Sequence, residues 1–226
     1  SLRAMAPNGG LIRRILRVGI PAGIENGMFQ IGKLSVSSLT STLGTAAIAA
    51  NAVANTTTTF LNIPANAVGM AALTVVGQCL GAGEKEQAVY YSRRLMLTAY
   101  CGAWVMNLSA FFFANRFAVS LFNLSPEATV LARQIVALHG AGCVIFWPMS
   151  FTMPNALRAA GNAKYTMTVA VFSMAVFRIG FGVFLATTMG MGVIGVWIAM
   201  QIDWVFRIIC FLIRWHSGKW QTKTLV

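Results

Sequence analysis

Long apolar segments separated by short polar breaks dominate this chain. The longest uncharged stretch runs from Leu34 to Gly83 and contains fifty residues. A single membrane helix needs no more than about 25 residues, so this stretch must hold most of two membrane passages, with a break at residues 43–45. The same pattern along the whole chain predicts six membrane helices, over residues 15–43, 46–80, 94–115, 126–159, 163–188 and 193–215.

Prolines divide two of these predicted helices. Pro64 follows Asn62 in the second helix and should break or kink it, because proline has no backbone N–H to donate. Pro148 and Pro154 should kink the fourth helix in the same way. Residues 84–93, ahead of the third helix, have the pattern of an amphipathic surface turn or short helix.

The amino-acid composition also indicates that the chain folds in a lipid bilayer. The chain is 57% hydrophobic and 10% charged, whereas soluble domains average about 25% charged residues. We therefore expect an all-α integral membrane protein whose six helices form one bundle. The formal net charge of +12 would suggest nucleic acid in a soluble protein. In a membrane protein it has a simpler cause, since basic residues collect on the cytoplasmic side, and no nucleic-acid partner is expected.

The positions of the basic residues test the helix count. Six passages put both chain ends on one side of the bilayer. Only Arg116 and Arg133 then fall on the opposite side, and Lys33, Arg178 and Arg207 are left within the membrane. This bias predicts cytoplasmic termini and a location in the cell (inner) membrane. Twelve basic residues share the side of the termini: Arg3, Arg13, Arg14, Arg17, Lys85, Arg93, Arg94, Arg158, Lys164, Arg214, Lys219 and Lys223.

Catalytic and metal-binding patterns are missing from the sequence. The four cysteines are widely spaced, and His139 and His216 are isolated. No CxxC, HExxH or GxSxG motif is present, and the chain contains one Asp. We therefore expect no enzyme, no metal site and no cofactor.

Glu25 is the first candidate for function. It lies about three turns into the first predicted helix, where a charge is costly and usually functional. An unpaired carboxylate there could take up and release a proton near neutrality, or attract a cation. The alternative is a structural pair with Lys33, but eight residues of helix separate the two by about 12 Å. The sequence therefore favours Glu25 as an ion-coupling residue.

Asp203 has two basic neighbours in the last two helices. The hairpin between these helices turns near Gly190, and Arg178 lies about as far before that turn as Asp203 lies after it. Arg207 is one helical turn beyond Asp203 on the same face. The three residues are expected to form a structural charge cluster, with a role in coupling as the alternative.

Two stretches could line a substrate cavity. In the second helix, polar residues spaced three and four apart share one face, which either packs through hydrogen bonds or lines a wet cavity. The kinked stretch around residues 147–155 is aromatic and contains methionines, which suits either an adaptable pocket or ordinary core packing. The polar ladder is Asn51, Asn55, Thr58, Asn62 and Asn66. The candidate cavity residues are Glu25, Asn51, Asn55, Asn62, Trp147, Met149, Met153 and Asn155.

Several segments resemble one transporter family. Residues 76–83, VGQCLGAG, resemble the "VGQxLGAG" end of a helix in multidrug and toxic compound extrusion (MATE) transporters. Residues 155–161, NALRAAG, are similar to their "LRGxG" segment. Residues 19–21 look like the start of their seventh helix, and residues 195–204 resemble their last. The matches occur in order across nearly the whole chain.

The resemblance implies the C-terminal lobe, helices seven to twelve, of a twelve-helix exporter. Such proteins expel organic cations or other toxic compounds in exchange for protons or sodium by alternating access. The implied partners are small molecules, chiefly lipophilic cations, the lipid bilayer and an N-terminal six-helix lobe that this chain lacks. Ser1 is not an initiator Met and no signal peptide follows, so we expect the chain to be part of a longer protein.

Two departures from the family pattern concern the coupling site. Many members place an acid about two turns after the proline of helix seven, but here Glu25 lies one turn after Pro21 and Phe29 holds the later position. Some members also have an Asp four residues after the "LRG" arginine, and here that residue is Asn162. The resemblance therefore implies proton coupling by Glu25, with Asn55 or Asn162 in support, unless the coupling acid lies in the missing lobe.

Two other functions fit the sequence. A flippase of lipid-linked precursors would need an anion-accepting cavity, with cationic side chains such as Lys33 and Arg178 facing inward. A membrane scaffold subunit would transport nothing and would tolerate neutralisation of both Glu25 and Asp203.

Overall fold

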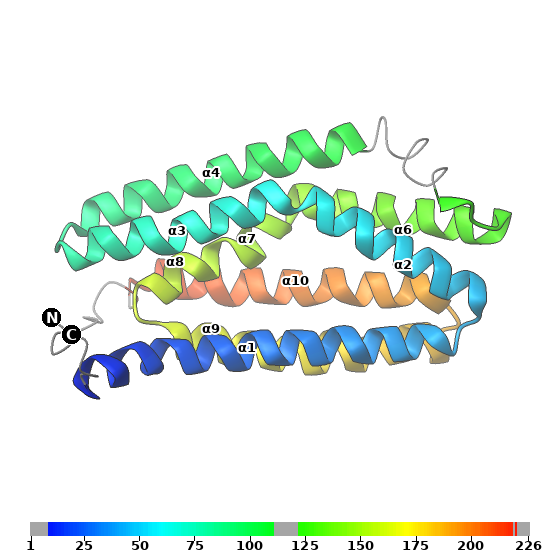
Figure 1. Ribbon diagram of the computed structural model, residues 1–226, viewed down its shortest axis with the longest axis horizontal. Helices are drawn as coiled ribbons and strands as arrows, with labels where there is room; N and C mark the ends of the chain where they lie inside the picture. The colour runs from blue at the N-terminus through cyan, green and yellow to red at the C-terminus, as the bar shows by residue number, and fades with distance from the viewer. Residues whose placement is uncertain (1–8, 111–121, 219, 221–226) are drawn as a thin grey trace, which may run out of the picture.

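The computed structural model describes residues 9–110, 122–218 and 220, and the regular elements in these ranges are helices (Figure 1). The elements are α1 (Gly9–Ser41), α2 (Thr45–Leu61), α3 (Ile63–Gly81), α4 (Lys85–Ser109), α6 (Pro126–Ile145), α7 (Trp147–Phe151), α8 (Met153–Ala159), α9 (Ala163–Ser173), the π-helical segments η4 (Met174–Phe181) and η5 (Phe184–Thr188), and α10 (Gly192–His216).

The helices run along the long axis of one bundle, and several of them continue one another end to end. α2 and α3 form one bent rod, α6, α7 and α8 form a second, and α9 continues into η4 and η5 (Figure 1). α3 packs against α4 and α8, α1 packs against α9, and α10 contacts both sides of the bundle. The start of α1 and the end of α10 lie at the same end of the bundle (Figure 1).

Each bend in the two rods lies just before a proline, as the sequence predicts. α2 ends at Leu61 ahead of Pro64, α6 ends ahead of Pro148, and α7 ends ahead of Pro154. A proline at position i leaves the carbonyl of residue i−4 without its helical donor. At Pro148 that carbonyl belongs to Val144, and the indole Nε1 of Trp104 donates to it at 2.9 Å. α4 therefore satisfies the backbone at the break in the neighbouring rod.

The third predicted helix starts earlier than expected. The sequence predicts a separate amphipathic segment before residue 94, whereas α4 runs without a break from Lys85 to Ser109. Ala88 and Ser92 continue the buried face formed by Ala99 and Ala103, so the apolar stripe on α3 stabilises the helix beyond the uncharged segment. Residues 111–115, where this helix was expected to end, lie outside the described residues. α1 also starts earlier than predicted, at Gly9.

The interior is built largely from small residues, and the exterior is apolar. Many fully buried side chains in α2, α3, α4 and α6 are alanines, which lets these helices approach closely. Large apolar side chains such as Phe60, Met70 and Val105 are instead exposed on the outside. Among the described residues, four helices are long and apolar enough to cross a membrane: Ile63–Gly81, Pro126–Ile145, Ala163–Thr188 and Gly192–His216. The chain is a multi-pass membrane protein.

Candidate functional site

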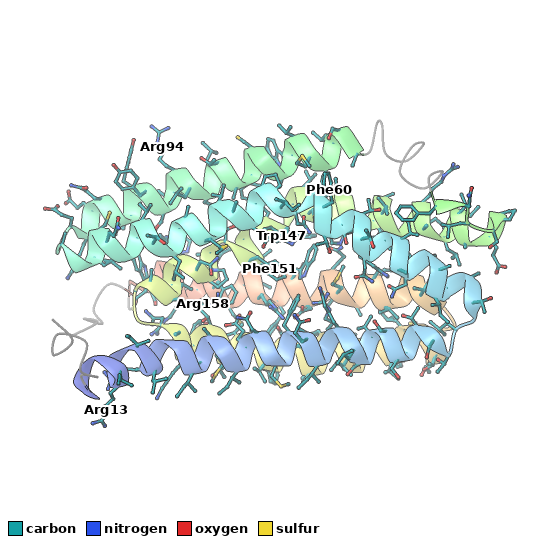
Figure 2. The ribbon with its side chains drawn as sticks, in the orientation of Figure 1. Arg13, Phe60, Arg94, Trp147, Phe151 and Arg158 are labelled. Atoms are coloured by element: carbon teal, nitrogen blue, oxygen red, sulfur yellow. The ribbon has the colours of Figure 1, made fainter. Side chains whose placement is uncertain are left out.

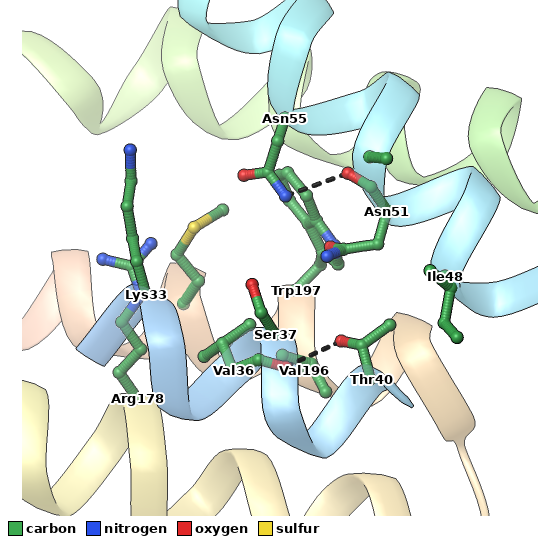
Figure 3. A pocket seen from close by; sticks show the side chains of 12 residues that line it. Lys33, Val36, Ser37, Thr40, Ile48, Asn51, Asn55, Arg178, Val196 and Trp197 are labelled. Atoms are coloured by element: carbon green, nitrogen blue, oxygen red, sulfur yellow. Dashed lines mark hydrogen bonds between the residues drawn. The ribbon is translucent and has the colours of Figure 1, made fainter. Parts of the chain in front are cut away.

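A cavity lies at the centre of the bundle and consists of two adjoining pockets. One pocket, of about 340 Å³, is lined by α1, the α2–α3 rod, α6–α8 and α10. The other, of about 410 Å³, lies between α1, α2, η4 and α10 (Figure 3). We call the two pockets together the central cavity. They share five lining residues: Lys33, Asn55, Arg178, Trp197 and Met200.

The polar ladder of α2 and α3 forms one wall of the central cavity. All five ladder residues line it: Asn51, Asn55, Thr58, Asn62 and Asn66. Asn51 also accepts a hydrogen bond from the indole of Trp197 at 3.1 Å, and Asn62 lies 3.3 Å from the ring nitrogen of His139. The ladder therefore both lines a polar cavity and packs through hydrogen bonds, which the sequence treated as alternatives.

Glu25 lines the cavity and is paired. Its Oε1 accepts a hydrogen bond from Nη2 of Arg158 at 2.5 Å, which joins α1 to α8. Nη1 of Arg158 donates to Asn155 Oδ1 at 2.7 Å. The other carboxylate oxygen, Oε2, is buried without a hydrogen-bond partner among the described residues. The isolated carboxylate expected from the sequence is therefore half of an ion pair, and its partner is Arg158 rather than Lys33.

Arg158 shows what sequence reasoning missed at this site. Counting charges by loop placed it with the basic residues on the side of the termini, because it lies at the end of the fourth predicted helix. The break before α8 instead directs its side chain inward, towards α1 (Figure 2). No sequence signal connects it with Glu25, since 133 positions separate the two residues.

Within the expected three-residue charge cluster, Asp203 and Arg207 form an ion pair, and Arg178 lies within electrostatic range of both. Arg207 Nε donates to Asp203 Oδ1 at 3.0 Å, one helical turn away, and to Ser173 Oγ at 2.9 Å. Asp203 is fully buried and Arg207 is nearly so. Arg178 has no ion pair among the described residues, and its guanidinium lies 5.2 Å from the ring centre of Phe29.

Asn162, the second predicted coupling residue, lies away from the cavity. Its side chain is buried, and its Oδ1 accepts hydrogen bonds from Nε and Nη2 of Arg214 at 3.2 and 2.6 Å. Its Nδ2 donates to the carbonyl of Ala160. Asn162 therefore ties the turn between α8 and α9 to the end of α10, and its oxygen is already used by a cation.

The aromatic stretch of the fourth predicted helix divides between two pockets. Trp147 and Asn155 line the central cavity. Met149 and Met153 instead line a separate pocket of about 390 Å³ beside Trp215. Residues two positions apart in a helix point to nearly opposite sides of it, so the four residues do not share one site.

An aromatic wall faces the polar ladder. Trp147 stacks on Phe151 with ring centres 4.9 Å apart, and Phe151 also meets Phe29 and Trp204 edge to face at 6.3 and 5.8 Å (Figure 2). The spacing of Trp147 and Phe151, four residues apart, is the sequence signal that could have identified Phe151. The central cavity thus offers apolar rings on one side and amide groups on the other.

Positive charge exceeds negative charge around the central cavity. Glu25 is the one acid that lines it among the described residues. Four basic residues also line it: Lys33, Arg158, Arg178 and Arg207. Among the described residues, no three His, Cys, Asp or Glu side chains come together to hold a metal ion.

Comparison with known proteins identifies the family. The MatE family model matches residues 21–184. The Thermotoga maritima protein called "Probable multidrug resistance protein NorM" is 26% identical over 214 residues, which are 95% of this chain and 46% of that protein. Human "Multidrug and toxin extrusion protein 1" is 27% identical over 143 residues, covering 63% of this chain and 25% of that protein.

Solved structures show the same fold. A crystal structure of a MATE protein in the bent conformation has a TM-score of 0.86 and 20% identity, and the match covers 100% of this chain and 50% of that one. A MOP superfamily transporter from Pyrococcus furiosus, described as having a binding pocket of reverse polarity, has a TM-score of 0.85 and 22% identity over 99% of this chain and 50% of its own. The chain thus spans about half the length of the bacterial relative and of both solved structures. It belongs to the MatE family, whose members are transporters and not enzymes.

Proposed function

We propose that this chain is one lobe of a small-molecule efflux transporter, working by alternating access together with a second lobe of similar size. The lobe crosses the membrane six times and keeps both termini in the cytoplasm. The names of the relatives support efflux, and the excess of basic residues on the side of the termini supports the orientation.

The observation that carries this proposal is a central cavity that the lobe leaves open. Lys33, Asn55 and Asn66 line the cavity and yet are exposed. Polar side chains at this depth are costly in lipid unless they face water or other protein. A second lobe covering this side would enclose the cavity between two bundles, which is the arrangement that alternating access requires.

Coupling in this lobe runs through the Glu25–Arg158 pair, and its ion is a proton. The pair joins α1 to α8 only while Glu25 is negatively charged, so protonation releases the contact between these helices. A sodium ion is disfavoured, because the guanidinium of Arg158 already donates to Glu25 Oε1 and Asn155 Oδ1, and its positive charge would repel a second cation at this carboxylate. Asn55 remains a supporting residue on the opposite wall of the cavity.

Transport by the full-length protein tests this function. In proteoliposomes, an imposed pH gradient should drive movement of ethidium, a cationic dye, or of carboxyfluorescein, an anionic one. Glu25→Gln should abolish the pH dependence, whereas Glu86→Gln, a change at an exposed acid in α4, should leave it intact. If neither dye moves under a pH or a sodium gradient, the proposal fails and a scaffold role becomes the better reading.

A further inference from the structure

Two cationic side chains, Lys33 and Arg178, line both halves of the central cavity. Lys33 Nζ from α1 and the Arg178 guanidinium from η4 lie 5.5 and 5.2 Å from the centre of the same Phe29 ring. Figure 3 shows Lys33 and Arg178 on the same side of the pocket. Neither residue has an ion pair among the described residues. Two like charges that line the same cavity repel each other.

The guanidinium of Arg178 is also incompletely satisfied by the described residues. Its side chain is more than nine-tenths buried, and its Nη1 has no acceptor among the described residues. A buried guanidinium left in this state is unfavourable, because it has lost water and its nearby acid, Asp203, is already paired with Arg207. The residue lines both halves of the central cavity, so a ligand bound there could supply the missing acceptor.

The other two arginines of the cavity each form an ion pair with an acid. Arg158 is paired with Glu25, and Arg207 is paired with Asp203. Each pair is close to neutral, and the uncompensated charge of the cavity is therefore that of Lys33 and Arg178. A lipophilic cation, the substrate expected from the family resemblance, would meet two unpaired positive charges here.

The rest of the cavity suits an apolar body. Trp197 and Met200 line both pockets beside Arg178, and the stacked rings of Trp147 and Phe151 continue the surface. Rings and a thioether offer adaptable apolar contacts. A ligand with a charged group at Arg178 would place its hydrophobic part along this wall.

We infer that the central cavity binds an anionic amphiphile, with a phosphate or carboxylate held by Lys33 and Arg178 and an apolar portion against the aromatic wall. This inference rests on the proposed transport function and names the substrate class for the same cavity. The anion could belong to a lipid-linked phosphate or to a soluble organic anion, since both present the same group to these two residues.

Ligand binding to the purified full-length protein in detergent tests the inference, because the cavity tryptophans report binding by their fluorescence. Farnesyl phosphate and farnesylamine share one apolar chain and differ in charge. Farnesyl phosphate should bind at least about ten-fold more tightly. Lys33→Gln and Arg178→Gln should each weaken its binding about ten-fold. Lys33→Arg should retain it, and Arg133→Gln, a change at an exposed basic residue of α6 outside the cavity, should have no effect.

A second probe separates the two sources of the anion. If 1-naphthyl phosphate binds with the same dependence on Lys33, soluble organic anions belong to the substrate class. If only farnesyl phosphate binds, the class is lipid-linked. Equal or tighter binding of farnesylamine, or unchanged binding of farnesyl phosphate to the Lys33→Gln variant, would overturn the inference. Because binding needs no ion gradient, gradient-driven transport of ethidium alone would refute the substrate class and leave the transport function standing.

Discussion

Arg158 holds the carboxylate of Glu25 at 2.5 Å and so links α8 to α1 across the wall of the central cavity. The pair is partly exposed, with 21% of the Arg158 side chain and 12% of the Glu25 side chain accessible. Glu25 is therefore accessible enough to exchange a proton, and the pair is buried enough for the charge of Glu25 to affect the contact between α1 and α8. The link ties the first helix of the lobe to α8, the segment at the third proline break.

The strength of this link should depend on pH. A double-mutant cycle with Glu25→Gln and Arg158→Gln should give a coupling energy of about 1–2 kcal/mol at pH 8, measured by thermal unfolding in detergent. The attraction requires a negative charge on Glu25, so the coupling energy should be present at pH 8 and should be lost once the carboxylate is protonated in acid. A coupling energy that stays constant down to pH 4 would mean that a charge-independent contact joins the two residues.

Asn162 should behave as a structural residue and not as a sodium ligand. Asn162→Leu removes the acceptor of two hydrogen bonds from Arg214 and should destabilise the protein by about 1–3 kcal/mol. Asn162→Asp keeps the acceptor and adds a counter-charge, so its melting temperature should equal or exceed that of the wild type. Transport by the Asp variant should remain independent of sodium. A new sodium dependence would instead place Asn162 at a coupling site.

Two glycines in the last two helical segments should respond differently to substitution by alanine. A Cβ at Gly195 would lie 2.9 Å from the backbone carbon of Leu185, so Gly195→Ala should cost about 1–3 kcal/mol through overpacking. At Gly182 the nearest atom is 3.9 Å away, and Gly182→Ala should be neutral or slightly stabilising. Thermal unfolding of both variants checks the contrast, and equal effects would argue against close packing of η5 on α10.

The hydrogen bond from Trp104 should stabilise the protein only because Pro148 leaves the Val144 carbonyl without its helical donor. Trp104→Phe removes the donor to the Val144 carbonyl and should destabilise the protein by about 1–2 kcal/mol. Pro148→Ala restores a backbone N–H at the break. The cost of Trp104→Phe should therefore be smaller when it is measured in the Pro148→Ala background. The same cost in both backgrounds would show that the indole contributes through packing alone.

Local chemistry explains the parts of the fold that could be predicted. The breaks at Pro64, Pro148 and Pro154 follow from missing N–H groups, and the Asp203–Arg207 contact follows from a spacing of four residues on one helix. Such features depend on residues within about one helical turn. The early start of α4 was missed because a charged surface segment can continue a helix when a neighbour covers its small residues.

The third member of the expected charge cluster, Arg178, lies within electrostatic range of Asp203 and also faces the cavity. Counting residues from the hairpin turn placed Arg178 level with Asp203. The helix that carries Arg178 is π-helical over Met174–Phe181, which changes the rotation per residue and hence the direction of its side chains. Arg178 accordingly faces the central cavity and the ring of Phe29.

The order of apolar segments, prolines and rare charges was sufficient to establish a helical membrane protein, the resemblance to its family and a short list of candidate residues. These properties depend on how each short segment partitions between water and lipid, which its own composition decides. The pairing of the charges was different, because Glu25 and Arg158 are 133 positions apart and meet only when α1 packs near α8. That packing neutralises one acid and leaves Lys33 and Arg178 without an ion pair among the described residues, so the sign of the net charge around the cavity is a property of the folded bundle.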